Sequence, residues 1–154
     1  MAKILVCDQT KCSGCRSCQV WCSFHHAGEC NPSLARLMVI AFEEKSSFVP
    51  VICHQCRDPW CMKACPADAM TRDPETNAVL ILADHCTGCR ACADACPFGV
   101  IRINPEGDML KCDLCSGDPV CVKSCIPRAL TFVEPAEAYL DRAASVASKT
   151  EGAV

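Results

Sequence analysis

The sequence predicts an α+β fold in which short strands and helical turns form a single domain. Three observations lead to this expectation. The chain has 154 residues, which is close to the usual size of one domain. Sixteen of its eighteen cysteines lie in four repeats of a four-cysteine motif. Short runs of aliphatic and β-branched residues, bounded by turn residues, separate the repeats.

Composition locates the strands and turns. Runs that predict strands lie at residues 3–6, 37–42, 48–52, 78–82, 100–103 and 129–133. The segment 104–108, which reads Asn-Pro-Glu-Gly-Asp, predicts a hairpin turn. Pro66 and Pro97 each follow a cysteine, and each begins a segment that can form one helical turn. Residues 1–133 are expected to form the domain, and 134–154 a tail, helical over 135–148, that is a candidate docking arm.

We number the cysteine motifs along the chain. Motif 1 is Cys12, Cys15, Cys18 and Cys22; motif 2 is Cys53, Cys56, Cys61 and Cys65; motif 3 is Cys86, Cys89, Cys92 and Cys96; motif 4 is Cys112, Cys115, Cys121 and Cys125. The spacing in motifs 1 and 3 is typical of a cubane 4Fe-4S cluster, for which thiolate sulfur is the required soft ligand. Motifs 2 and 4 have a wider gap before the third cysteine. Since all four motifs are complete, the sequence predicts four 4Fe-4S clusters and electron transfer.

Two other uses of cysteine compete with this interpretation. A disulfide framework needs an oxidising compartment, but residues 1–7 lack the sustained apolar run of an export signal. A zinc module uses two CxxC pairs that lie farther apart than the thiols here. We therefore expect a cytoplasmic protein whose cysteines bind iron, with zinc as the alternative that iron and sulfide analysis would reveal.

Composition also excludes several functions. The formal net charge is −3, and four oxidised clusters would make it about −11, which argues against a nucleic-acid partner. The longest apolar run, 78–83, is far shorter than the roughly 20 residues of a membrane-spanning helix, so no membrane insertion is expected. The sequence contains no nucleotide-binding or hydrolase motif, which predicts a non-catalytic protein.

From residue 4 to about residue 133, the chain resembles the four-cluster polyferredoxin subunits of molybdenum or tungsten oxidoreductases, hydrogenases and carbon monoxide dehydrogenases. The resemblance rests on the following segments: Lys11-Cys-Ser-Gly-Cys-Arg-Ser-Cys18, Cys53-His-Gln-Cys56, Pro59 before Cys61, Cys65-Pro66, Cys86-Thr-Gly-Cys89, Cys96-Pro97 and Lys111-Cys-Asp-Leu-Cys115. Phe24-His25-His26, Asn31-Pro32 and Ala35-Arg36 look closest to the iron–sulfur subunits of tungsten-dependent aldehyde oxidoreductases.

The resemblance implies two pseudo-symmetric ferredoxin-like dicluster halves, an outer half of 1–30 with 105–133 and an inner half of 48–104. In two-cluster ferredoxins the fourth cysteine of each motif binds the neighbouring cluster. Spacing alone supports the inner ligand sets, which are Cys53, Cys56, Cys61 with Cys96, and Cys86, Cys89, Cys92 with Cys65. The outer sets rest on the resemblance and are Cys12, Cys15, Cys18 with Cys125, and Cys112, Cys115, Cys121 with Cys22.

The resemblance also implies partners. One is a catalytic subunit with a pterin-bound metal, most closely a tungsten or molybdenum aldehyde oxidoreductase, and the other is a ferredoxin or a flavin subunit that reduces NAD. The alternatives are a subunit of a carbon monoxide dehydrogenase, formate dehydrogenase or hydrogenase, or a freely diffusing polyferredoxin that purifies alone.

Several residues outside the motifs are of types that can bind metals or relay protons or electrons. We interpret Cys7 as a buried thiol and Cys30 as an exposed one. Because the cysteine sets are complete, the four histidines are expected to pack or to donate hydrogen bonds near the clusters; they are His25, His26, His54 and His85. Trp21 and Trp60 each precede a motif cysteine and are expected to shield a cluster from water.

Overall fold

The computed structural model describes residues 3–135, and this part of the chain contains both helices and short antiparallel strands. The mixture confirms the α+β expectation. β1 (Ile4–Cys7) pairs with β8 (Leu130–Val133), β2 (Met38–Phe42) with β3 (Ser47–Val51), β4 (Met70–Arg72) with β5 (Val79–Ile81), and β6 (Arg102–Ile103) with β7 (Met109–Leu110). The α-helices are α1 (Ser17–Ala27), α2 (Trp60–Lys63), α3 (Ala91–Asp94) and α4 (Val120–Lys123). Beyond Pro135, the expected tail helix lies outside the described residues.

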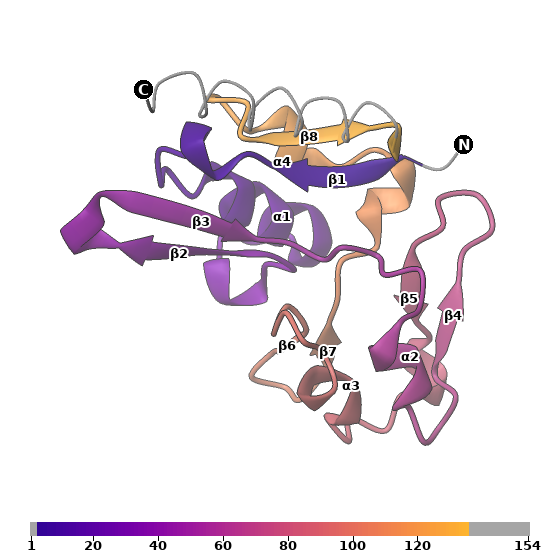
Figure 1. Ribbon diagram of the computed structural model, residues 1–154. Helices are drawn as coiled ribbons and strands as arrows, with labels where there is room; N and C mark the ends of the chain where they lie inside the picture. The colour runs from indigo at the N-terminus through magenta and orange to yellow at the C-terminus, as the bar shows by residue number, and fades with distance from the viewer. Residues whose placement is uncertain (1–2, 136–154) are drawn as a thin grey trace.

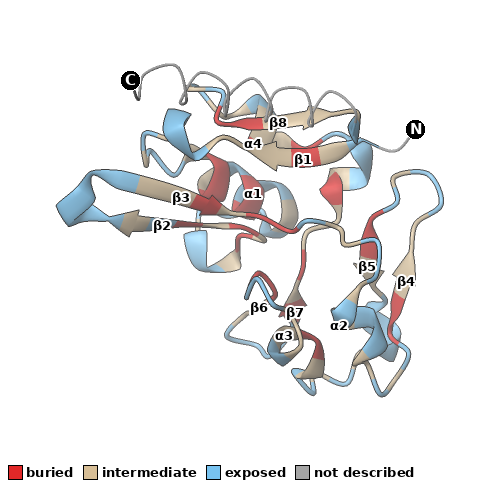
Figure 2. Ribbon diagram, in the orientation of Figure 1, coloured by how far each residue is buried: buried red, intermediate tan, exposed pale blue. Residues whose placement is uncertain are grey.

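The elements gather in two groups, which Figure 1 shows one above the other. The upper group contains β1, β8, α1, α4 and the β2–β3 hairpin, and the lower group contains β4 to β7 with α2 and α3. Each group has its own apolar core, and Figure 2 shows buried residues in both groups. Leu5, Leu114 and Leu130 are central to the upper core, and Met70, Val79 and Val100 to the lower one.

Strand pairing ties motifs together across the sequence. β4 follows motif 2 and pairs with β5, which leads into motif 3. β8 follows motif 4 and pairs with β1, which leads into motif 1, so the two ends of the described chain form one ladder. Helices repeat the arrangement, because α1 packs on α4 and α2 packs on α3. The fold therefore joins motif 2 to motif 3 and motif 1 to motif 4.

Short helices lie at different places from those expected. The segments after Pro66 and Pro97 are hydrogen-bonded turns, whereas α2, α3 and α4 end just before the fourth cysteine of their motifs. A helix cannot run on through these turns, because the third residue after the fourth cysteine has a left-handed backbone: φ is 47° at Asp68, 59° at Gly99 and 53° at Arg128. The expected hairpin at 104–108 is present, and the three-residue strand β4 was not foreseen.

Replacing Leu130 by alanine should weaken the ladder that holds the upper group together. Leu130 is 2% exposed, and truncating a fully buried leucine costs about 3 kcal/mol of unfolding free energy. Thermal denaturation of the anaerobic protein should therefore begin at a clearly lower temperature. Leu82, which is 37% exposed, provides the matched control, since Leu82→Ala should cost less than about 1 kcal/mol. Equal effects of the two substitutions would contradict this account of the core.

Candidate metal centres

The four motifs share one local backbone conformation. The residue just before the second cysteine has a left-handed backbone in each motif, with φ of 72° at Gly14, 46° at Gln55, 67° at Gly88 and 58° at Leu114. This region costs non-glycine residues energy and persists only where the surroundings require it. At Gln55 and Leu114, motifs 2 and 4 make this left-handed step without the glycine that motifs 1 and 3 have there.

The lower group of elements contains two cavities that are each lined by four motif cysteines. One encloses about 370 Å³ of space without protein atoms, part of it open to solvent, and its cysteines are Cys53, Cys56, Cys61 and Cys96. The other encloses about 310 Å³, and its cysteines are Cys65, Cys86, Cys89 and Cys92. Each cavity takes three cysteines from one motif and the fourth from the other. We call them the motif 2 cavity and the motif 3 cavity.

In the upper group, the thiols form two further sets. Within each set, the other thiols raise the pKa of one buried member. The pKa of Cys18 is raised to about 12, first by burial and then by the thiols of Cys125, Cys15 and Cys12. Burial is also the main cause of the raised pKa of Cys121, and the thiols of Cys112, Cys22 and Cys115 add to it, with a smaller effect from Cys18. Each of these sets draws three thiols from one motif and a fourth from the other, as the lower cavities do.

Backbone amides point at the fourth cysteine in three of the motifs. Ala69 N–H donates to Cys65 Sγ at 3.3 Å, Leu130 N–H to Cys125 Sγ at 3.4 Å, and Arg36 N–H to Cys22 Sγ at 3.3 Å. A hydrogen bond donated to sulfur favours its thiolate form and shifts the potential of a cluster that the sulfur ligates. The first two donors lie close to the start of the strand that follows the cysteine, Ala69 four residues after Cys65 and Leu130 five residues after Cys125.

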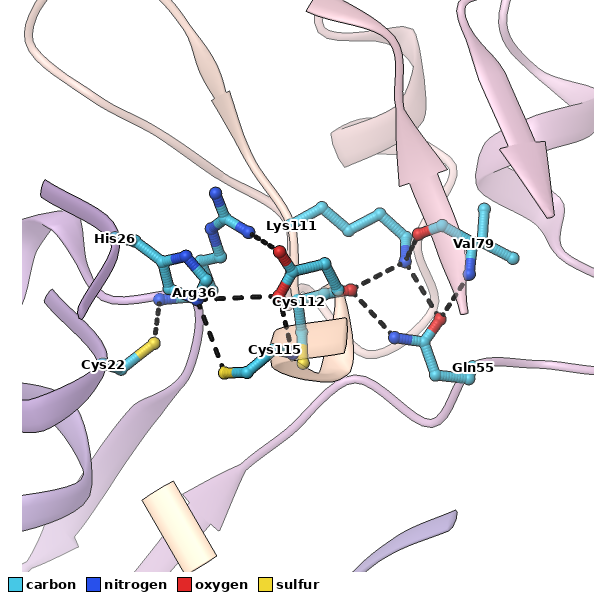
Figure 3. A network of polar contacts seen from close by, with 9 residues as sticks. Cys22, His26, Arg36, Gln55, Val79, Lys111, Cys112 and Cys115 are labelled. Carbon is cyan, nitrogen blue, oxygen red and sulfur yellow. Dashed lines mark hydrogen bonds and ion pairs between the residues drawn. The ribbon is translucent and has the colours of Figure 1, made fainter. Parts of the chain in front are cut away.

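A carboxylate network adjoins motif 4. Asp113 accepts a hydrogen bond from Cys115 N–H at 2.9 Å, forms an ion pair with Arg36 Nη1 at 2.6 Å, and lies 3.5 Å from His26 Nε2. Burial alone would raise the pKa of Asp113, but the Arg36 guanidinium and the Cys115 amide hold it below its ordinary value. His26 Nε2 is 3.7 Å from Cys115 Sγ, which places this histidine beside a motif cysteine as expected (Figure 3).

A buried lysine adjoins motif 2. The side chain of Lys111 is 6% exposed and lines the motif 2 cavity. Figure 3 shows it reaching away from Arg36 and His26 toward Gln55 and Val79. Its Nζ lies 3.6 Å from Cys53 Sγ, and it donates to Gln55 Oε1 at 3.2 Å, to Cys112 O at 3.3 Å and to Val79 O. Burial raises the pKa of Cys61, and the charge of Lys111 opposes that shift. From the sequence, a charged residue beside a cysteine is either solvated or compensates cluster charge, and the burial of Lys111 favours the second interpretation.

The remaining cysteines, histidines and tryptophans considered outside the motifs lie nearer the surface. Cys7 is half-buried against the upper core, with its pKa raised to about 11 mainly by burial, and Cys30 is exposed. The ring of His54 packs on Phe98 with centroids 4.4 Å apart, and His85 is exposed. Trp60 lines the motif 2 cavity but is 62% exposed, and Trp21 is 52% exposed, so each indole covers its surroundings only in part.

Comparison with known proteins identifies the family. Residues 44–135, well over half of the chain, match the family model of the 4Fe-4S dicluster domain. The chain belongs to this 4Fe-4S dicluster family. The matched region includes motifs 2, 3 and 4. The donor sets fit the cofactor, because four thiols surround each lower cavity and four soft thiolates are what one cubane cluster requires.

Relatives of this dicluster protein are subunits of redox enzymes. It is 43% identical over 116 residues to the aliphatic sulfonate oxidoreductase polyferredoxin-like subunit of Pyrococcus furiosus, an alignment that covers 75% of the chain and 66% of that relative. It is 35% identical to the putative electron transport protein YsaA of Escherichia coli, covering 87% of the chain and 91% of the relative. With the beta subunit of the NADH-dependent phenylglyoxylate dehydrogenase of Aromatoleum evansii it shares 31% identity over 86% of the chain, but over only 30% of that longer protein.

Solved structures contain the same fold. A chain of the active site complex BamBC of benzoyl coenzyme A reductase superposes with a TM-score of 0.53 and 26% identity, and the match covers 97% of each chain. Together with the family match and the relatives, this confirms the expectation of an iron–sulfur electron-transfer protein of the polyferredoxin type. Among the described residues, no helix combines the length and apolar character needed to cross a membrane.

Two glycines in equivalent loops should differ in their tolerance of alanine. Both have a positive φ, so alanine costs each loop about 1–2 kcal/mol. A Cβ added at Gly14 would also lie 2.4 Å from the Phe48 ring, whereas at Gly88 its nearest contact is Gly107 O at 3.4 Å. Gly14→Ala should therefore lose more iron per chain and more thermal stability than Gly88→Ala. Adding Phe48→Ala should recover part of the loss in the Gly14 variant, and equal losses in the two single variants would refute the steric argument.

Proposed function

We propose that this chain is the electron-transfer subunit of an oxidoreductase complex and holds four 4Fe-4S clusters on sixteen cysteines. The observation that carries the proposal is the pair of lower cavities, each of which combines three cysteines of one motif with the fourth cysteine of another. Such exchange between motifs is the arrangement of two-cluster ferredoxins. The inner ligand sets are therefore Cys53, Cys56, Cys61 with Cys96, and Cys86, Cys89, Cys92 with Cys65.

For the outer half we propose two further sets. They are Cys12, Cys15, Cys18 with Cys125, and Cys112, Cys115, Cys121 with Cys22. The electrostatic partners of Cys18 and Cys121 support this division, because each thiol is affected most strongly by members of its own set. The ladders support it too, since β4 with β5 and β8 with β1 join the same pairs of motifs. We infer two pseudo-symmetric ferredoxin-like halves, 48–104 and 1–30 with 105–133.

The residues of the chain determine how well the sites transfer electrons. Each 4Fe-4S cluster supplies a centre that takes up and releases one electron. The two cores exclude water from Cys18, Cys53, Cys92 and Cys121, and backbone amides donate to Cys65 and Cys125 Sγ. Four centres in series can accept in turn the two electrons of a substrate oxidation.

The catalytic chemistry is assigned to a partner. The relatives are named for sulfonate, phenylglyoxylate and benzoyl coenzyme A chemistry, and the matched solved chain lies in an active site complex. These names support a catalytic subunit as the partner of this chain. We propose that it carries a tungsten or molybdenum pterin of the aldehyde oxidoreductase type, with a ferredoxin or a flavin subunit at the other end, in the cytoplasm. The tail, 134–154, is our candidate for the docking arm.

Metal analysis of the native, anaerobically purified protein tests this function directly. The proposal predicts roughly sixteen irons and an equal amount of acid-labile sulfide per chain. Size-exclusion chromatography should place the chain in a complex whose larger subunit contains tungsten or molybdenum. Zinc without sulfide would overturn the cluster assignment, and a chain that migrates alone with all its iron would favour the freely diffusing shuttle.

Serine substitutions test the exchange of the fourth cysteines. Cys96→Ser should alter the same cluster as Cys56→Ser, because both residues line the motif 2 cavity, and Cys92→Ser should alter a different one. Each variant is titrated potentiometrically and followed by electron paramagnetic resonance. The cluster that a substitution alters is the one whose reduction midpoint shifts. In the outer half, Cys125→Ser should match Cys15→Ser. A Cys96→Ser variant that reproduces the spectrum of Cys92→Ser would show that each motif binds its own cluster.

A further inference from the structure

Lys111 is a buried cation without a carboxylate partner among the described residues. It is one of three buried polar residues in this part of the chain, with Gln19 and Ser23. The ion pairs of residues 3–135 involve other cations, namely Lys11, His26, Arg36, Lys63 and Lys123. Lys111 Nζ contacts three neutral oxygens and one sulfur, Cys53 Sγ. An ammonium group needs a compensating charge when it leaves water.

The position of Lys111 identifies the compensating anion. Its side chain lines the cavity of Cys53, Cys56, Cys61 and Cys96, and its nitrogen lies 3.6 Å from one of those sulfurs. A cluster on four thiolates has a net negative charge, and reduction adds one electron to it. Because the cation lies in a water-poor environment, its attraction for that added charge is weakly screened. The lysine therefore stabilises the reduced form more than the oxidised form.

The motif 3 cavity has no equivalent charge among the described residues. Its lining contains one basic residue, Arg90, which is exposed. Water and salt screen an exposed charge strongly. The two inner sites thus have similar cysteine ligands but unequal cationic surroundings.

We propose that Lys111 raises the reduction potential of the cluster held by Cys53, Cys56, Cys61 and Cys96, and so makes this cluster the electron acceptor of the inner pair. The inference rests on the proposed four-cluster function. Lys111 acts through the positive charge that it holds beside the cluster site. Its nitrogen also donates to the carbonyl of Cys112, a proposed ligand in the outer half, at 3.3 Å. The lysine therefore lies where an electron would pass between the halves.

The direct test replaces Lys111 by methionine and measures reduction potentials in the whole protein. Lys111→Met should lower the potential of one cluster so that its reduced-to-oxidised ratio at a fixed potential falls at least tenfold, which corresponds to about 59 mV for a one-electron couple. The step that moves should be the one altered in Cys56→Ser. An unchanged titration in a fully loaded Lys111→Met protein would overturn the proposal.

Two variants of Gln55 separate charge from structure. Gln55 bridges the same elements, because its amide donates to Cys112 O at 2.8 Å and accepts from Val79 N–H at 2.9 Å. Gln55→Ala removes this bridge but leaves the lysine charge, so it should reduce stability and lower the potential of the motif 2 cluster less than Lys111→Met does. Gln55→Glu places a carboxylate on Lys111 and should lower the potential, as Lys111→Met does.

The outcomes also distinguish this inference from the proposed function. If Lys111→Met fails to load iron, Lys111→Gln, which keeps a hydrogen-bond donor beside Val79 O and Cys112 O, gives the deciding measurement: a lowered potential supports the proposal and an unchanged one overturns it. A potential that falls equally in Gln55→Ala would show that the lysine acts through structure alone. Failure of the proposed function would instead appear in the wild-type protein as fewer than four clusters, before any substitution is made.

Discussion

The structure depends on bringing sulfur atoms from two distant segments of the chain to one point. Each motif supplies three cysteines from one short segment, with a wider gap before the third in motifs 2 and 4. In the two lower cavities the fourth cysteine of the lining belongs to another motif, and tertiary structure brings it there. β4 with β5 connects motifs that are close in sequence, whereas β8 with β1 joins opposite ends of the described chain. The ladders are short, and their importance lies in the motifs that they bring together.

This requirement explains why the apolar cores are small and divided. Cys18, Cys22 and Cys121 belong to the upper core, and Cys53 and Cys92 to the lower one. Thiols thus occupy positions where a larger domain would place leucine or phenylalanine. Burial raises the pKa of Cys18 to about 12, so at neutral pH the metal-free site holds a neutral thiol, and iron must displace the proton. The free energy of cluster binding then contributes to folding, as in other small metal-dependent domains.

The sequence predicted those features of the fold that a short stretch of neighbouring residues indicates. Cysteine spacing indicated the motifs, and turn residues indicated the hairpin at 104–108. The left-handed residue before the second cysteine of each motif was not predicted. Gln55 and Leu114 adopt the same conformation without a local signal, since the surrounding fold imposes it on them. The burial of Lys111 was also invisible, because a lysine beside a cysteine has the same sequence appearance whether it faces water or a cavity. Only the packing of Gln55 and Val79 around its nitrogen determines the result.

Charge is also what distinguishes sites that the backbone makes alike. In motif 4 the residue after the first cysteine is Asp113, whose charge is balanced by Arg36 at 2.6 Å. In motif 2 the corresponding residue is His54, and the cation nearby is Lys111, which has no carboxylate partner within residues 3–135. Cluster sites with similar loops and equal surrounding charges would have similar potentials, and no site would be preferred by an electron. On one side of Cys112 the charge of Asp113 is balanced by Arg36, whereas on the other side Lys111 has no carboxylate partner within residues 3–135. The charges around neighbouring sites are therefore unequal. Side chains can thus give these sites different potentials while the cluster geometry stays the same.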